Sequence, residues 1–163
     1  MPVQNSSALV VTLPSDLEIL LTREFDAPRH LVFEAMTKPE YVSQWWGCSG
    51  STMPVCEMDF RAGGAWRFVL RMAGGEEFAF HGVYQEIVPP EMVVSTECYE
   101  EPKFGNPEWL ATMCLEDLGE RTRMTTLVRH KTVEARNGHL QSGMETGAGQ
   151  TFDRLAELLA SMR

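Results

Sequence analysis

Four side chains in this sequence titrate near neutral pH and can bind a metal ion or transfer a proton, namely His30, His81, His130 and His139. No two of them are spaced i,i+4 or as His-x-His, the spacings that present two metal ligands from one helix or strand. We therefore predict no metal site. His30 and His139 are expected on solvated helix or loop faces. His130 lies in phase with the apolar face of the last predicted strand, so we expect it near the mouth of a pocket.

Motifs that bind nucleotides or supply a catalytic nucleophile are absent from the sequence. It contains no GxGxxG, no P-loop and no GxSxG, and the glycine-rich run 143–149 lacks a lysine at phosphate spacing. The four cysteines form no CxxC pair, and their positions do not indicate a disulfide framework. We therefore expect no cofactor.

Charged residues at two places could contact a ligand, but each has a simpler structural role. Asp59 and Arg61 lie on one face of a predicted strand, where we expect a structural ion pair. The alternative is that Arg61 orients an acidic group of a ligand. The acidic residues Glu97, Glu100 and Glu101 are expected at a solvated strand end and loop rather than in a catalytic site.

Large aromatic and flexible apolar side chains are the strongest indication of a binding site. Thioethers and aromatic rings fill irregular space and adapt to apolar molecules. Each such residue alone is typical of a protein core, but the set is large enough to line a ligand-sized pocket. The residues that we expect to line an internal cavity are Trp66, Phe68, Leu70, Phe80, Tyr84, Trp109, Met113, Met124, Thr126, His130, Met144, Ala148 and Phe152.

The elements that must position these residues follow a simple order along the chain. Period-two patterns, broken by Gly and Pro, predict strands at 17–25, 52–60, 65–73, 77–88, 92–100, 109–118 and 121–131. Two short helices are predicted between the first two strands, and Asp26 is the expected N-cap of the first. The short connections favour consecutive antiparallel pairing. Residues 1–16 are expected to form a flexible leader and residues 17–163 a single domain.

The last predicted helix is long and amphipathic. Apolar residues recur at steps of 3–4 residues behind Ser142 and Glu145, which have the spacing of a capping box. Ala148 and Gly149 remove volume from the inner face of this helix, so either a ligand or the sheet backbone is expected to approach there. Residues 133–140 are expected to form a helical turn before it.

Glycines mark two positions where the sheet must deviate from regular geometry. Gly63 and Gly64 predict a tight turn that leads into a strand with large side chains on one face. A bulge at Gly82 would place Phe80 and Tyr84 on opposite faces of the sheet, so the sequence does not decide whether the two side chains share a face.

Several short segments along the chain carry a family resemblance. They are Arg23–Pro28, Val32–Ala35, Thr37–Pro39, Gln44–Gly47, Asp59–Trp66, Phe80–Tyr84, Ile87–Glu91, Gly143–Gly147 and Asp153–Leu155. In this order they resemble the SRPBCC superfamily, which includes START domains and birch-pollen-allergen-like proteins, and within it homologues of the activator of heat-shock protein 90 ATPase (AHSA-type). The resemblance implies an α+β helix-grip fold, in which a bent seven-stranded antiparallel sheet packs on a long C-terminal helix, with two short helices after the first strand.

The resemblance implies several functions, because members of this superfamily bind lipids, hormones and aromatic molecules or catalyse reactions on them. The expected function is binding of a small hydrophobic or amphipathic ligand. One alternative is an enzyme of the cyclase, dehydratase or hydrolase type that uses Tyr84, His130 and Arg61. Another is a chaperone or stress-response interaction module, which requires an exposed apolar patch and a closed interior. A homodimer would be a simple use of such a patch.

Composition restricts the partners. The net charge of −9 argues against nucleic acid and against an anionic membrane surface, since both need clustered Lys and Arg. No apolar run approaches the roughly 20 residues that span a bilayer. Residues 1–15 lack the basic residue and apolar core of a signal peptide, so a reducing, cytoplasmic location is expected.

Overall fold

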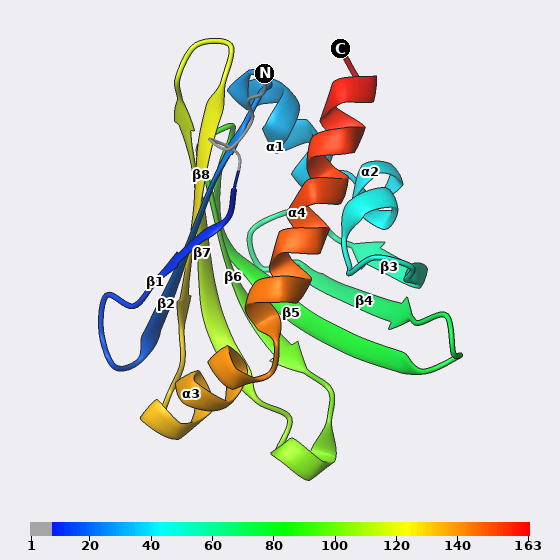
Figure 1. Ribbon diagram of the computed structural model, residues 1–163, viewed down its shortest axis with the longest axis vertical. Helices are drawn as coiled ribbons and strands as arrows, with labels where there is room; N and C mark the ends of the chain where they lie inside the picture. The colour runs from blue at the N-terminus through cyan, green and yellow to red at the C-terminus, as the bar shows by residue number, and fades with distance from the viewer. Residues whose placement is uncertain (1–7) are drawn as a thin grey trace.

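One bent antiparallel sheet forms the body of the protein, and a long helix crosses one face of it (Figure 1). The computed structural model describes residues 8–163. The strands are β1 Val10–Thr12, β2 Glu18–Phe25, β3 Thr52–Met58, β4 Ala65–Arg71, β5 Glu77–Val88, β6 Met92–Tyr99, β7 Glu108–Asp117 and β8 Thr122–Arg129. Their order across the sheet is β1-β2-β8-β7-β6-β5-β4-β3, so the predicted α+β fold and meander are confirmed.

The sheet has one strand more than predicted. β1 pairs antiparallel with β2 and places Val11 opposite Leu21. It lies in the segment that we predicted as a flexible leader, so that prediction is wrong for residues 10–12; residues 1–7 of the leader lie outside the described part of the chain. The sheet therefore has eight strands instead of seven.

Helices cover only one face of this sheet (Figure 1). They are α1 Arg29–Thr37, α2 Pro39–Trp45, the short 3-10 helix η2 Pro102–Phe104, α3 Val133–Gln141 and α4 Met144–Ser161. Between residues 8 and 163, no helix is both long and apolar enough to span a membrane. α3 is a full helix where only a turn was predicted, and its N-cap Thr132 accepts a hydrogen bond from the Ala135 N–H.

Two predicted helix caps are wrong. Asp26 is exposed and lies before the start of α1, whose N-cap is Pro28 without a side-chain hydrogen bond. The N-cap of α4 is Gly143, in the left-handed conformation with φ +86°. The Ser142 hydroxyl donates backward to the carbonyl of His139 at 2.6 Å, which removes it from a capping box. A left-handed residue between α3 and α4 turns the chain sharply, and glycine adopts this φ without steric cost.

The C-terminal half of α4 is fixed to the rest of the protein. Leu155 and Leu159 are buried in the core. Arg23 of β2, itself buried, donates to Asp153 at 2.8 Å. Arg154 donates to the carbonyls of Gln44, Gly47 and Cys48 and to the Ser51 hydroxyl, at 3.0–3.3 Å. These bonds tie α4 to α2 and to the loop that follows α2.

The Gly63-Gly64 pair closes the hairpin between β3 and β4 against β5. The Gly63 N–H donates to the Tyr84 carbonyl at 2.7 Å, and the Tyr84 N–H donates to the Gly64 carbonyl at 2.9 Å. Gly63 has φ +86°, and a Cβ on Gly64 would lie 1.9 Å from the Asp59 carbonyl oxygen. Both positions therefore need glycine, and the turn is part of the wall built by β3, β4 and β5.

Replacing Gly149 by alanine is expected to stabilise the protein by about 0.5–1 kcal/mol. Gly149 lies inside α4, and a Cβ there would meet no atom within 4 Å, so of the two expected alternatives the close approach of the sheet backbone is wrong at this glycine. Alanine loses less backbone entropy on folding than glycine. Urea denaturation of both proteins would measure the change, and an unchanged or lower midpoint would contradict it.

Candidate functional site

A cavity of about 960 Å³ lies between the sheet and the N-terminal half of α4. Among the residues predicted to line it, all except Met124 do so. Met124 is fully buried in the core, so its predicted place in the cavity is wrong. It pairs across the sheet with Arg23 of β2, whose side chain binds Asp153 of α4, so it lies where α4 is anchored to the sheet.

Phe80 and Tyr84 both line the cavity, so their side chains point to the same face of the sheet. Tyr84 pairs with Ser95 and Phe80 with Tyr99 in one unbroken register, and the irregularity between β5 and β6 falls after Tyr84 instead of at Gly82. Burial raises the pKa of the Tyr84 hydroxyl well above its usual value.

One row of side chains crosses the sheet inside the cavity. Trp66 on β4 pairs with Gly82 on β5, and Glu97 on β6 pairs with Trp109 on β7. His130 follows β8, next to the residue that pairs with Leu110, and so continues the row. A Cβ on Gly82 would lie 2.6 Å from Trp66 Nε1 and 1.8 Å from the Thr96 carbonyl oxygen. The missing side chain at Gly82 thus leaves room for the Trp66 indole.

Glu97 is the acidic centre of this row. Its Oε1 accepts a hydrogen bond of 2.7 Å from the Trp109 indole N–H. Burial raises the pKa of the Glu97 carboxyl, and the Trp109 bond opposes this only in part. The prediction of a solvated strand end is therefore wrong for Glu97. The same prediction is correct for Glu100, whose partly exposed carboxylate binds Arg67 and His81 on the outer face of the sheet.

A histidine pair closes the other end of the row. His130 Nε2 and His139 Nδ1 are 2.8 Å apart, and the Trp109 ring lies 5.3 Å and 4.6 Å from the two imidazoles. His130 lines the cavity as predicted and is buried, with its Nδ1 unpartnered among the described residues. His139 also lines the cavity, so the prediction that it sits on a solvated face is wrong.

The histidine pair is expected to make stability fall in mild acid. Burial, followed by the charge of His130, lowers the pKa of His139 to about 4, and burial lowers that of His130. Unfolded histidine has a pKa of about 6.5, so the unfolded chain binds more protons between these values. The free energy of unfolding should therefore drop, by at most about 3 kcal/mol for His139, as the pH falls from 6.5 to 4.

Thermal denaturation across this range would measure the effect. His139→Phe should flatten the pH dependence, because it removes the group that takes up the proton. His30→Gln changes an exposed histidine and should leave the dependence unchanged. A wild-type midpoint that stays constant between pH 7 and pH 4 would contradict the prediction.

Arg61 does not reach the cavity. It is exposed and pairs with Asp59 at 3.0 Å, which confirms the structural ion pair. The alternative role of Arg61 in orienting an acidic ligand group is therefore wrong. None of the described residues that line the cavity is Lys or Arg, whereas Glu97 and Glu134 are acidic.

The rim of the cavity is formed by the loop between β6 and β7 and by α3 and α4. Phe104 on η2 is exposed for 64% of its surface and lies beside Tyr99. Met144 and Ala148 of α4 line the same cavity. Trp46, which follows α2, contacts Phe68 and Phe80 edge-on and forms part of the wall.

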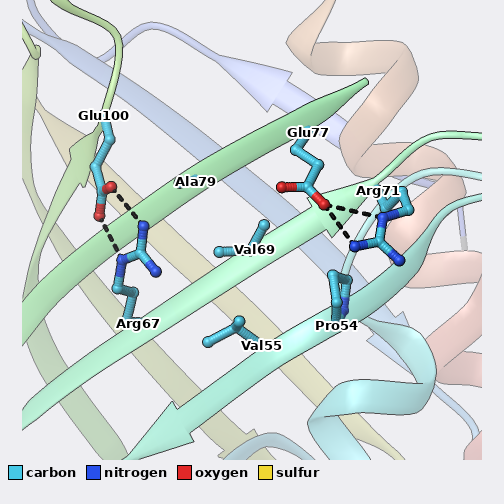
Figure 2. Close-up of a pocket in the computed structure, with 8 residues that line it drawn as sticks. All are labelled: Pro54, Val55, Arg67, Val69, Arg71, Glu77, Ala79 and Glu100. Atoms are coloured by element: carbon cyan, nitrogen blue, oxygen red, sulfur yellow. Dashed lines mark hydrogen bonds and ion pairs between the residues drawn. The ribbon is translucent and has the colours of Figure 1, made fainter. Parts of the chain in front are cut away.

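A second hollow, of about 300 Å³, lies on the outer face of β3, β4 and β5. Figure 2 shows that its charged side chains already pair with each other: Arg67 with Glu100, and Arg71 with Glu77, at 2.7–3.0 Å. Val69 lies between the two pairs. These ion pairs hold the strands in register and leave less charge for a ligand, so the internal cavity is the better candidate site.

Comparison with known proteins agrees with this architecture. Residues 26–160 match the family described as Activator of Hsp90 ATPase homolog 1-like protein. The structure of a Rhodobacter sphaeroides protein is similar, with TM-score 0.88 and 25% identity over 94% of this chain and 99% of its own. A Nitrosomonas europaea protein gives TM-score 0.81 and 25% identity over 92% and 98%. The AHSA1 protein from Silicibacter pomeroyi, with TM-score 0.72 and 22% identity over 90% and 99%, shares the fold. No curated protein sequence matches the chain significantly.

Proposed function

The chain belongs to the family of Activator of Hsp90 ATPase homolog 1-like proteins, and from the cavity in its fold we propose that it binds a small hydrophobic or amphipathic molecule. The family is known for ligand binding in a hydrophobic cavity.

The observation that carries the proposal is the size and lining of the cavity. Its volume of about 960 Å³ lies at the upper end of the roughly 300–1,000 Å³ found for small-molecule sites. Aromatic and thioether side chains make up much of the wall, and a few polar groups gather in one row. A protein that needed only a stable core would fill this volume, because unfilled space costs stability.

Native mass spectrometry of the purified protein, followed by a thermal-shift screen of hydrophobic molecules, tests the proposal. A co-purified mass, or a concentration-dependent rise in the denaturation midpoint, would support it. The identity of a co-purified molecule would also give its chemical class. If no compound in a broad apolar set shifts the midpoint and no mass co-purifies, the proposal fails.

An enzyme of the cyclase, dehydratase or hydrolase type is the second candidate function. It is favoured by the arrangement of Tyr84, Glu97 and His130 around one cavity, where a carboxyl group with a raised pKa suits general acid–base chemistry. Incubation with a molecule identified by mass spectrometry would test it. A product mass that forms with the wild-type protein but not with Tyr84→Phe or His130→Ala would support catalysis.

An interaction module is less well supported, because that hypothesis requires a closed interior. The large exposed apolar side chains of the described residues belong to several elements and loops; they are Val10, Leu13, Val83, Val88, Phe104, Leu118 and Val133.

A further inference from the structure

We infer that the molecule bound in this cavity carries a basic amine, and that Glu97 recognises it as the carboxylate partner of its ammonium group. The inference rests on the proposed function, because it assigns the chemical class of a ligand to the same cavity. It follows from the charge of the lining, the rings around Glu97 and the hydrogen bonding of its carboxyl group.

The charge of the lining favours a cation over an anion. Fatty acids, phosphates and other anions need a Lys or Arg partner inside an apolar cavity, because an unpaired buried charge is costly. The described lining residues include neither, and both histidines are held neutral by burial. Glu97 and Glu134 are its acidic members, Glu97 inside and Glu134 exposed on α3 at the rim.

Aromatic rings surround Glu97 on the cavity face of the sheet. Trp109 is its cross-strand partner on β7, and Tyr99 lies two residues further along β6. On the β5 side, Phe80 and Tyr84 stand to either side of Gly82, where the Trp66 indole fills the space that a side chain would take. An ammonium group bound to Glu97 would therefore lie among aromatic rings, and the faces of such rings attract cations.

The Glu97 carboxyl group retains hydrogen-bonding capacity for a ligand. Oε1 accepts a hydrogen bond from Trp109, which orients the group, and no side chain among residues 8–163 donates to Oε2. Apart from the two glutamates, the titratable groups that line the cavity are Cys48, Tyr84, Tyr99, His130 and His139, and none of them is a cation at neutral pH.

Proton balance is simple for such a complex. A protonated Glu97 would pass its proton to a free amine, whereas an ionised Glu97 would pair directly with an ammonium ion. Either route gives one ammonium–carboxylate pair. Burial raises the pKa of Glu97 when the cavity lacks a cation, and an ammonium group would remove the reason for this rise.

Three matched probes test the inference: naphthylmethylamine, naphthylmethanol and naphthaleneacetic acid. Their binding to the wild-type protein would be measured by isothermal titration calorimetry and by the fluorescence of the cavity tryptophans. The amine is expected to bind about tenfold more tightly than the alcohol, and the acid should bind most weakly. Glu97→Gln keeps an acceptor for Trp109 but not the charge, so amine and alcohol should then bind equally.

Two further variants make the result decisive. Glu97→Met replaces a buried acid by an apolar side chain of similar length, should fold even if Glu97→Gln does not, and should also lose the preference. Glu157→Gln changes an exposed glutamate of α4 that does not line the cavity, so this variant should keep the preference. The inference is overturned if the wild-type protein prefers the alcohol or the acid, or if the Glu97 variants still prefer the amine; the proposed function survives in these cases. If none of the three probes binds, the inference is overturned, and the proposed function is then decided by the broad thermal-shift screen and the search for a co-purified mass.

Discussion

Replacement of Ala148 by tryptophan is expected to abolish ligand binding while leaving the fold intact. Ala148 lies on the inner face of α4 and lines the cavity, so an indole at this position would occupy the space of the ligand. The loss of affinity should be about a hundredfold or more for a probe that binds the wild-type protein. Stability should change by less than about 1.5 kcal/mol, because the new side chain enters open space instead of a filled core.

The matched control for this experiment is Ala160→Trp. Ala160 lies on the same helix but is exposed and does not line the cavity. This variant should bind as the wild-type protein does, when both are titrated with the same fluorescent apolar probe. Equal binding by wild type and Ala148→Trp would show that the ligand, if there is one, does not occupy this cavity.

Replacement of Gly82 by alanine is expected to destabilise the protein by about 3 kcal/mol or more. The added Cβ would lie 1.8 Å from the Thr96 carbonyl oxygen, which belongs to the backbone of the neighbouring strand and cannot rotate away. It would also displace the Trp66 indole, whose Nε1 lies 2.6 Å from the same point. β5 and β6 would therefore have to separate, or the chain would have to find another register.

Urea denaturation monitored by circular dichroism would measure this loss. Gly138→Ala is the control, because Gly138 lies inside α3 and a Cβ there would meet nothing within 4 Å. That change should leave stability equal or slightly higher. If Gly82→Ala had the same urea midpoint as the wild-type protein, β5 and β6 could not lie as close together at Gly82 as the structure shows.

The fold could be predicted from the sequence because its signals are local. The seven longer strands alternate between apolar and polar residues, and Gly or Pro marks the connections, so their order and pairing follow from the chain itself. β1 escaped prediction because three residues carry too little alternation to be distinguished from a loop. The cap of α4 was also missed, since Ser142 fits a capping box in sequence but donates to His139 in space.

The site was predicted only in its apolar part. Most of the predicted aromatic and thioether residues reach the cavity, because strand alternation fixes the face on which they lie. The same signal was present for Glu97, which alternates in phase with Val93 and Tyr99, but its charge favoured a solvated position. His139 carried no such signal. Its contact with His130 depends on how α3 docks, which no local pattern in the sequence reports.

The anchoring of α4 is uneven, so the residues that stabilise the fold are different from the residues that line the cavity. Arg154, Asp153 and the two core leucines hold the C-terminal half, while Ala148 and its neighbours face open space. Residues in the first half can therefore be exchanged with little penalty to folding. A library randomised at 144, 148 and 151 would yield receptors of graded cavity size on one scaffold. In natural lineages the same turns would be free to diverge, so paralogues could acquire different ligands without rebuilding the sheet.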